Sequence, residues 1–215
     1  TSPAMTVGSS VLSDPFTQSI TYIAKFSGST GAPLWGQAAG GSNGAFGVGL
    51  ASDNYGNVYM TGGFGDASIS FGSTTVTRTY PGAVPQLALF LVPYSSADVV
   101  TWNKTIGSAT AGAWGWSIAL ASCGQIWVSG NYNQDADVDG NNLALVPGPD
   151  PIFIAGYDLS GGVVGYSGLA SGGDDQNGIA CDGAGNVYMC SDYFAPTTIG
   201  PDVLTGGFSE YFYMA

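Results

Sequence analysis

An internal repeat constrains the fold of this chain more than any other feature of its sequence. The segment DNYGNVYM at 53–60 returns as DGAGNVYM at 182–189, and the related segment ASCGQIWV lies between them at 121–128. The spacings are 68 and 61 residues between the aligned glycines, which are Gly56, Gly124 and Gly185. In 215 residues this period leaves room for a little over three units. The sequence therefore predicts an array of similar supersecondary units.

The sequence of each unit predicts four short strands. A short apolar run, a Gly-containing turn and an alternating run form the first two strands, and the second strands read VYMTG, IWVSG and VYMCS. The third strand repeats as TYIAKF, ALFLVPY, IFIAGY and FYMA, and the fourth as APLWGQ, VVTWNK and VVGYSG. A Gly-centred insert between the second and third strands is interpreted as an extra hairpin or a long turn. No segment shows the 3.6-residue period of an amphipathic helix.

These strands predict an all-β fold, a β-propeller-like repeat array of four-stranded antiparallel blades. The array holds about three blade equivalents and is incomplete at both ends. Its parts within a single domain are a partial blade at 1–42, blades at 43–109 and 110–171, and a partial blade at 172–215. A β-sandwich is the alternative for a sequence of this kind.

The charge of the chain argues against several classes of function. Fifteen acidic side chains against three basic ones give a formal net charge of −12, which does not suit nucleic acid or an anionic membrane surface. The chain contains no His, the residue that most often acts as general base or catalytic zinc ligand. An enzyme would have to use carboxylates, and Asp174 and Asp175 form the candidate pair. Adjacent residues in a loop usually point apart, so we expect no enzyme.

The repeat resembles a known family. The pattern runs from an Asp-containing turn through GNVYMTG and an insert to FIAKF and a following Trp. It is similar to the bacterial β-propeller repeat abbreviated SBBP. The matching residues are Asp53, Gly56, Asn57, Tyr59, Gly62, Lys25, Phe26 and Trp35. The sequence departs from that pattern at Pro93 and at Ala121. The resemblance covers nearly the whole chain. It implies a propeller-like fold and an extracellular setting, and it implies no activity.

The incomplete terminal blades predict self-association. Counted against the strand order of that family, the chain opens with third and fourth strands and closes with first, second and part of a third. We expect the C-terminal blade of one molecule to be completed head to tail by the N-terminal strands of the next, which gives a ring or a fibre. The alternative is a fragment of a longer propeller chain. The expected subunit contact is the aromatic last strand, Tyr211, Phe212, Tyr213 and Met214.

The expected function is that of an extracellular or cell-surface structural protein, whose terminal blades join subunits into a fibre or larger assembly. The alternative is a carbohydrate- or protein-binding β-propeller module of a secreted surface protein. For that alternative, exposed Trp114, Trp116 and Phe46 would offer stacking platforms for sugars, whereas buried rings would fill the wedge between blades. No stretch of 18 apolar residues occurs, so no membrane insertion is expected.

One segment suggests a metal site. In DADVDGNN, oxygen-bearing side chains alternate before and after Gly140, which matches the front half of a calcium-binding loop. The twelfth position is Val146 instead of a bidentate Glu, and carboxylates at a period of two equally suit the solvent face of a strand. The candidate calcium ligands are Asp135, Asp137, Asp139 and Asn141; no other cofactor is expected.

Two covalent modifications follow from short patterns. Asn103 begins the sequon Asn103-Lys104-Thr105 in a predicted fourth strand, where a glycan could project into solvent. Cys181 and Cys190 lie on the two arms of one predicted hairpin. Their parity places them on one face but offset from direct opposition, so a disulfide between them is feasible and strained. Cys123 is expected to be free.

Overall fold

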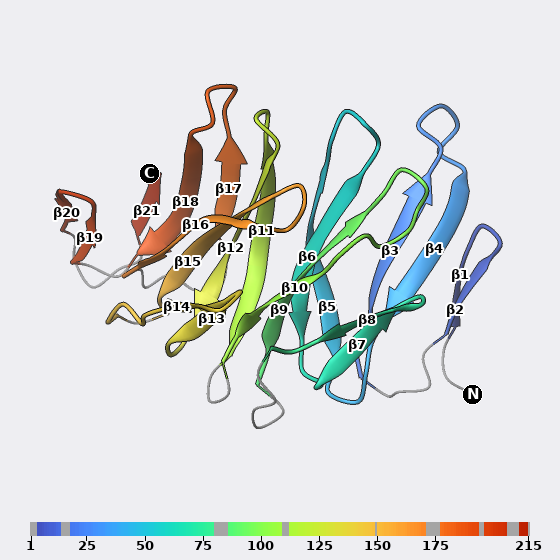
Figure 1. Ribbon diagram of the computed structural model, residues 1–215, viewed down its shortest axis with the longest axis horizontal. Coiled ribbons are helices and arrows are strands. Elements are labelled where there is room, and N and C mark those ends of the chain that lie inside the picture. Colours follow the sequence, from blue (N-terminus) through green and yellow to red (C-terminus); the bar gives the residue numbers. More distant parts are fainter. Residues whose placement is uncertain are drawn as a thin grey trace.

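The computed structural model describes residues 4–13, 18–79, 86–108, 112–148, 150–170, 177–193, 196–205 and 211–214. These residues form an all-β fold with no helix. The larger sheets lie side by side in a row that follows the sequence from one end of the molecule to the other (Figure 1). The described residues close into neither a barrel nor a propeller.

One sheet contains all four predicted strands of a repeat in their predicted order. It comprises β11 (Ala113–Ala121), β12 (Gln125–Tyr132), β15 (Ile152–Asp158) and β16 (Val163–Leu169). Every neighbouring pair is antiparallel. Sequential pairing through short turns explains why each apolar run finds its partner in the next run along the chain.

The preceding repeat forms the same arrangement with an addition. Its strands are β5 (Ala45–Ser52), β6 (Val58–Phe64), β9 (Ala88–Tyr94) and β10 (Lys104–Gly107). A hairpin from the following repeat, β13 (Ala136–Val138) and β14 (Asn141–Leu143), pairs with the outer edge of β10. The insert of one repeat therefore reaches back to the fourth strand of the repeat before it.

The two sheets at the ends of the row are smaller. Strands β3 (Thr21–Phe26) and β4 (Pro33–Ala39) form a two-stranded sheet. Strands β17 (Gly178–Cys181), β18 (Val187–Tyr193) and β21 (Tyr211–Met214) form a three-stranded sheet at the opposite end (Figure 1).

The Gly-centred inserts are hairpins, as one of the two interpretations predicts. Besides β13 and β14 they form three two-stranded sheets: β1 (Ala4–Val7) with β2 (Ser10–Ser13), β7 (Ser68–Phe71) with β8 (Thr74–Thr77), and β19 (Thr197–Ile199) with β20 (Asp202–Leu204). Each turns at a glycine with positive φ, a conformation that costs glycine little.

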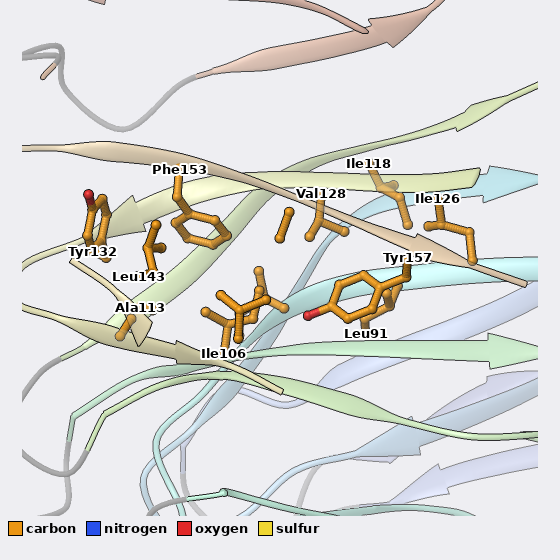
Figure 2. Packing of buried hydrophobic residues seen from close by; sticks show 14 of the residues in the cluster. Leu91, Ile106, Ala113, Ile118, Ile126, Val128, Tyr132, Leu143, Phe153 and Tyr157 are labelled. Atoms are coloured by element: carbon orange, nitrogen blue, oxygen red, sulfur yellow. The ribbon is translucent and has the colours of Figure 1, made fainter. Parts of the chain in front are cut away.

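The core lies between the sheets. Figure 2 shows the larger buried cluster, in which Leu91 and Ile106 of one sheet face Val128 and Tyr157 of the next. A second cluster around Phe64, Phe71 and Phe90 lies between the first two sheets of the row and beneath the hairpin β7–β8. Aromatic and branched side chains from alternate strand positions thus hold neighbouring sheets together.

A carboxylate-centred turn explains the repeated octapeptide. Asp182 accepts hydrogen bonds from the backbone N–H groups of Ala184 and Asn186, from the Asn186 side chain at 2.7 Å and from the Tyr188 hydroxyl at 3.0 Å. Asp53 accepts the equivalent bonds in the first copy, from Tyr55, Asn57 and Tyr59. The Asp, Asn and Tyr of the pattern therefore form one network that fixes the turn.

This network predicts a pH dependence of stability. The hydrogen bonds from Asn186, joined by those from Tyr188 and Ala184, lower the pKa of Asp182 from 3.8 to about 2. Because the pKa is lower in the folded chain, the stabilisation is fully present above pH 3.8 and is lost as the pH falls through about 2.

We expect Asp182→Asn to lower the melting temperature near pH 6. Between about pH 6 and about pH 2.5 the melting temperature of this variant should then fall less than that of the wild type, because the variant has no carboxylate to protonate. Asp202→Asn, at an exposed carboxylate of β20, is the control; equal pH profiles for both variants would contradict the assignment.

Candidate self-association site

Two strands at the ends of the row have an unpaired edge. In the inner sheets each third strand pairs on both sides: β9 with β6 and β10, and β15 with β12 and β16. Among the described strands, β3 pairs only with β4, and β21 only with β18. Free edges expose backbone donors and acceptors that can pair with another strand.

A groove of about 530 Å³ runs along the free edge of β3 and is bounded on its other side by β5. We refer to it as the β3–β5 groove. Its walls carry large apolar side chains that are exposed to solvent, including Tyr22, Val48 and Leu50. In the inner sheets, the second strand of the same repeat pairs with this edge of the third strand, and the first strand lies beyond it. The groove is therefore located where the sheet β3–β4 has no first and second strands.

The exposure of Leu50 indicates most clearly that no described strand fills the β3–β5 groove. Leu50 pairs with Met60, and the equivalent residue of the next repeat, Ile118, pairs with Val128. The exposed fraction is 57% for Leu50 and 8% for Ile118. Ile118 is buried because it packs against β5, whereas no described strand covers the corresponding face of Leu50.

A smaller cavity of about 330 Å³ lies between the first two sheets of the row. It is lined by the rings of Trp35 and Tyr94, whose centroids are 6.1 Å apart, and by the Lys25–Asp98 ion pair at 2.8 Å. The indole N–H of Trp35 is buried away from this space, and no described residue accepts a hydrogen bond from it. The cavity thus combines aromatic surface and a charged pair.

The predicted calcium ligands lie on the hairpin β13–β14. Asp135 accepts from the Leu145 N–H at 2.7 Å, Asp137 accepts from the Gly140 N–H at 3.0 Å, and Asp139 pairs with the Lys104 ammonium at 2.6 Å. Asn141 donates to the Val138 carbonyl. Within the described ranges, no group of three or more His, Cys, Asp or Glu is arranged to hold a metal. Calcium binding stays a prediction from the sequence pattern.

The sequon and the cysteines have clear positions. Asn103 is half-buried just before β10, and the Thr105 hydroxyl interacts with that of Thr79 at 2.9 Å. In the register of β17 and β18, Cys181 opposes Val187 and Cys190 opposes Gly178. The cysteines are thus three positions apart and on opposite faces, because successive residues alternate. The structure does not bring together the predicted pair, and Cys181, Cys190 and Cys123 are all free thiols.

Some of the remaining candidate residues lie in described strands, and others lie outside the described residues. Trp114, Trp116 and Phe46 are half-buried on β11 and β5, and a Cβ on Gly63 would lie 2.5 Å from the Phe46 ring. These rings therefore pack against neighbouring residues and are not the exposed stacking platforms that a sugar site would need. The backbone of Tyr211–Met214 forms an edge strand. Asp174 and Asp175 fall outside the described residues.

No protein-family model matches the chain, and no curated protein matches it. The resemblance to the bacterial β-propeller repeat therefore stays a prediction. In the described part of the chain no helix is long and apolar enough to cross a membrane.

Sequence reasoning anticipated the edge strand β21 but missed the β3–β5 groove and Leu50. The available signal was the alignment of the first strands, which places Leu50 beside Ile118 of the next repeat. This alignment indicates an uncovered Leu50 only when one knows which face of the strand meets the neighbouring repeat. The bulge at Val48, where the pairing shifts between Gly47 and Gly49, sets that face.

Proposed function

We propose that this chain is an extracellular or cell-surface structural protein whose copies join head to tail through their end sheets. The observation that carries the proposal is the β3–β5 groove beside the unpaired edge of β3. A solvent-exposed groove with apolar walls next to an open strand edge suits the addition of strands from another chain. The subunit joint would lie between the sheet β3–β4 of one copy and the sheet β17–β18–β21 of another, at the edge of β18 that Tyr211–Met214 occupies within a single chain.

The strand inventory supports this joint. If each four-stranded sheet is a propeller-like blade, the described residues contain three first, three second and three fourth strands, and four third strands. One copy's β3 and β4 together with another's β17 and β18 would complete a blade. A contact between unlike surfaces is heterologous, so repetition yields a ring where the rotation closes and a fibre where it does not.

Composition agrees with an extracellular polymer. The chain has 35 glycines and a net charge of −12, and like charge keeps assembled surfaces from associating laterally. The resemblance to secreted β-propeller repeats points the same way. A glycan at Asn103 would fit this setting.

The test is sedimentation velocity on the purified chain over a range of concentrations, together with negative-stain imaging and intact mass. Growth from the 21.7 kDa species into rings or fibres is expected, and excess mass would report glycosylation. A single 21.7 kDa species at every concentration would overturn the proposal.

A second candidate is the binding of a small ligand in the cavity beside Trp35. The Lys25–Asp98 pair supplies the polar groups that would orient a carbohydrate against the aromatic walls of Trp35 and Tyr94. A screen of oligosaccharides by thermal shift tests it, since a ligand that binds the folded state raises the melting temperature. Absence of any shift that depends on Trp35 would reject this candidate.

A further inference from the structure

In the hairpins β5–β6, β11–β12 and β17–β18, two neighbouring residue pairs on opposite faces differ in side-chain size. On one face the paired residues are small: Gly49 with Thr61, Ser117 with Ser129, and Gly178 with Cys190. The next pair along the strands is on the opposite face and is large: Leu50 with Met60, Ile118 with Val128, and Ile179 with Met189. Because strand residues alternate between faces, each repeat has a small pair on one face, which we call the small face, and a large pair on the opposite face, which we call the large face.

Within the chain, the large face of one repeat packs on the small face of the repeat before it. A Cβ on Gly49 would lie 2.8 Å from Cγ2 of Ile118, so the glycine makes room for the isoleucine. At the next junction, the backbone N–H of Ile179 donates to the Ser117 hydroxyl at 3.2 Å. The Ser129 hydroxyl adds a hydrogen bond to the Asn177 side chain at the same junction. Ile118 and Ile179 thus contact the same position of the repeat before them, occupied by Gly49 and Ser117.

At each end of the array, no described residue packs on one of these faces in the way that the next repeat does at the internal junctions. At the N-terminal end Leu50 is exposed on the large face. At the C-terminal end the small face carries Gly178, where the thiol of Cys190 is the one described group that an added Cβ would meet within 4 Å. The two end faces therefore repeat the pairing of the two internal junctions, in which a large residue of one repeat meets a small residue of another, Gly49 or Ser117.

We infer that the β3–β5 groove receives the β17–β18 hairpin of a second copy of the chain, with Leu50 of one copy seated over Gly178 of the other. The inference rests on the proposed function and specifies its partner and register. In this arrangement β18 of one copy lies next to β3 of the other. Since β21 occupies that edge of β18 in the isolated chain, β3 of the incoming copy takes the place of β21.

Directed crosslinking tests this register. Cys190 belongs to the small face, so a Leu50→Cys variant should place a thiol beside the partner's thiol. Cys123 and Cys181 are replaced with Ser to remove other thiols, and oxidised glutathione accepts the two electrons and two protons as the disulfide forms. The control is Tyr55→Cys in the same background, because Tyr55 is an exposed turn residue outside the groove. Sedimentation first identifies the concentrations at which each variant assembles.

The expected result is a ladder of crosslinked species in the assembled Leu50→Cys sample, with a peptide that joins positions 50 and 190. The Tyr55→Cys control should give no such ladder. Assembly without a 50–190 crosslink would overturn this register while leaving the proposed function intact. A wild-type chain that does not assemble at any concentration would overturn both.

Discussion

Replacing Gly130 with Ala should destabilise the folded chain by about 3 kcal/mol, through overpacking against backbone. A Cβ at this position would overlap the carbonyl oxygen of Trp114 on the neighbouring strand, and backbone cannot rotate away as a side chain can. The strands approach closely here because the pairing of β11 with β12 shifts at the bulge between Gly115 and Ser117. Gly62 holds the equivalent place opposite the bulge of β5.

Chemical denaturation of the Gly130→Ala variant measures this effect. Gly165→Ala is the matched control, because Gly165 also lies in a strand but its Cβ would be in ordinary contact with the Trp127 ring at 3.5 Å. Ala at that site should be neutral, or stabilising by up to about 1 kcal/mol, since glycine loses more backbone entropy on folding. Equal stabilities for the two variants would contradict the close-approach explanation.

Replacing Leu50 with Lys should weaken assembly by at least roughly a hundredfold, since each tenfold change corresponds to about 1.4 kcal/mol. In the joint, the variant loses the burial of the exposed part of Leu50, worth roughly 1–2 kcal/mol. It also places an ammonium group against the apolar face around Gly178. The isolated chain should tolerate the change because Leu50 is 57% exposed there.

Sedimentation of Leu50→Lys beside Tyr55→Lys checks this prediction. Tyr55 is 80% exposed in a turn, so its variant should assemble as the wild type does. Thermal unfolding of both variants verifies that the subunit remains folded. Assembly of Leu50→Lys at wild-type concentrations would show that the β3–β5 groove is not the contact.

Much of the architecture follows from local patterns. Alternating runs such as VYMTG and IWVSG predict strands, and the structure is all-β. The Gly-centred inserts predict hairpins because a glycine with positive φ permits a tight turn, as at Gly72 and Gly140. Asp53 and Asp182 recur because each accepts several hydrogen bonds in the same turn.

Other features depend on contacts that a single strand does not encode. The pairing of β13 with β10 joins two repeats and places Asp139 beside Lys104. Asp137 accepts from the Gly140 N–H within the hairpin turn. A metal-loop interpretation of DADVDGNN anticipates neither contact. The parity argument for Cys181 and Cys190 failed because the register sets them three positions apart. The importance of Leu50 emerges only when its exposure is compared with that of Ile118.

Hydrogen exchange at concentrations below and above the onset of assembly tests the central claim most directly. If copies join through the β3–β5 groove, amides of β3 (Thr21–Phe26) should gain protection on assembly, because their unpaired edge acquires a partner strand. Amides of β12 and β15, already paired on both sides, should exchange at the same rates in both samples. Assembly that leaves exchange in β3 unchanged, or a chain that never assembles, would contradict the account.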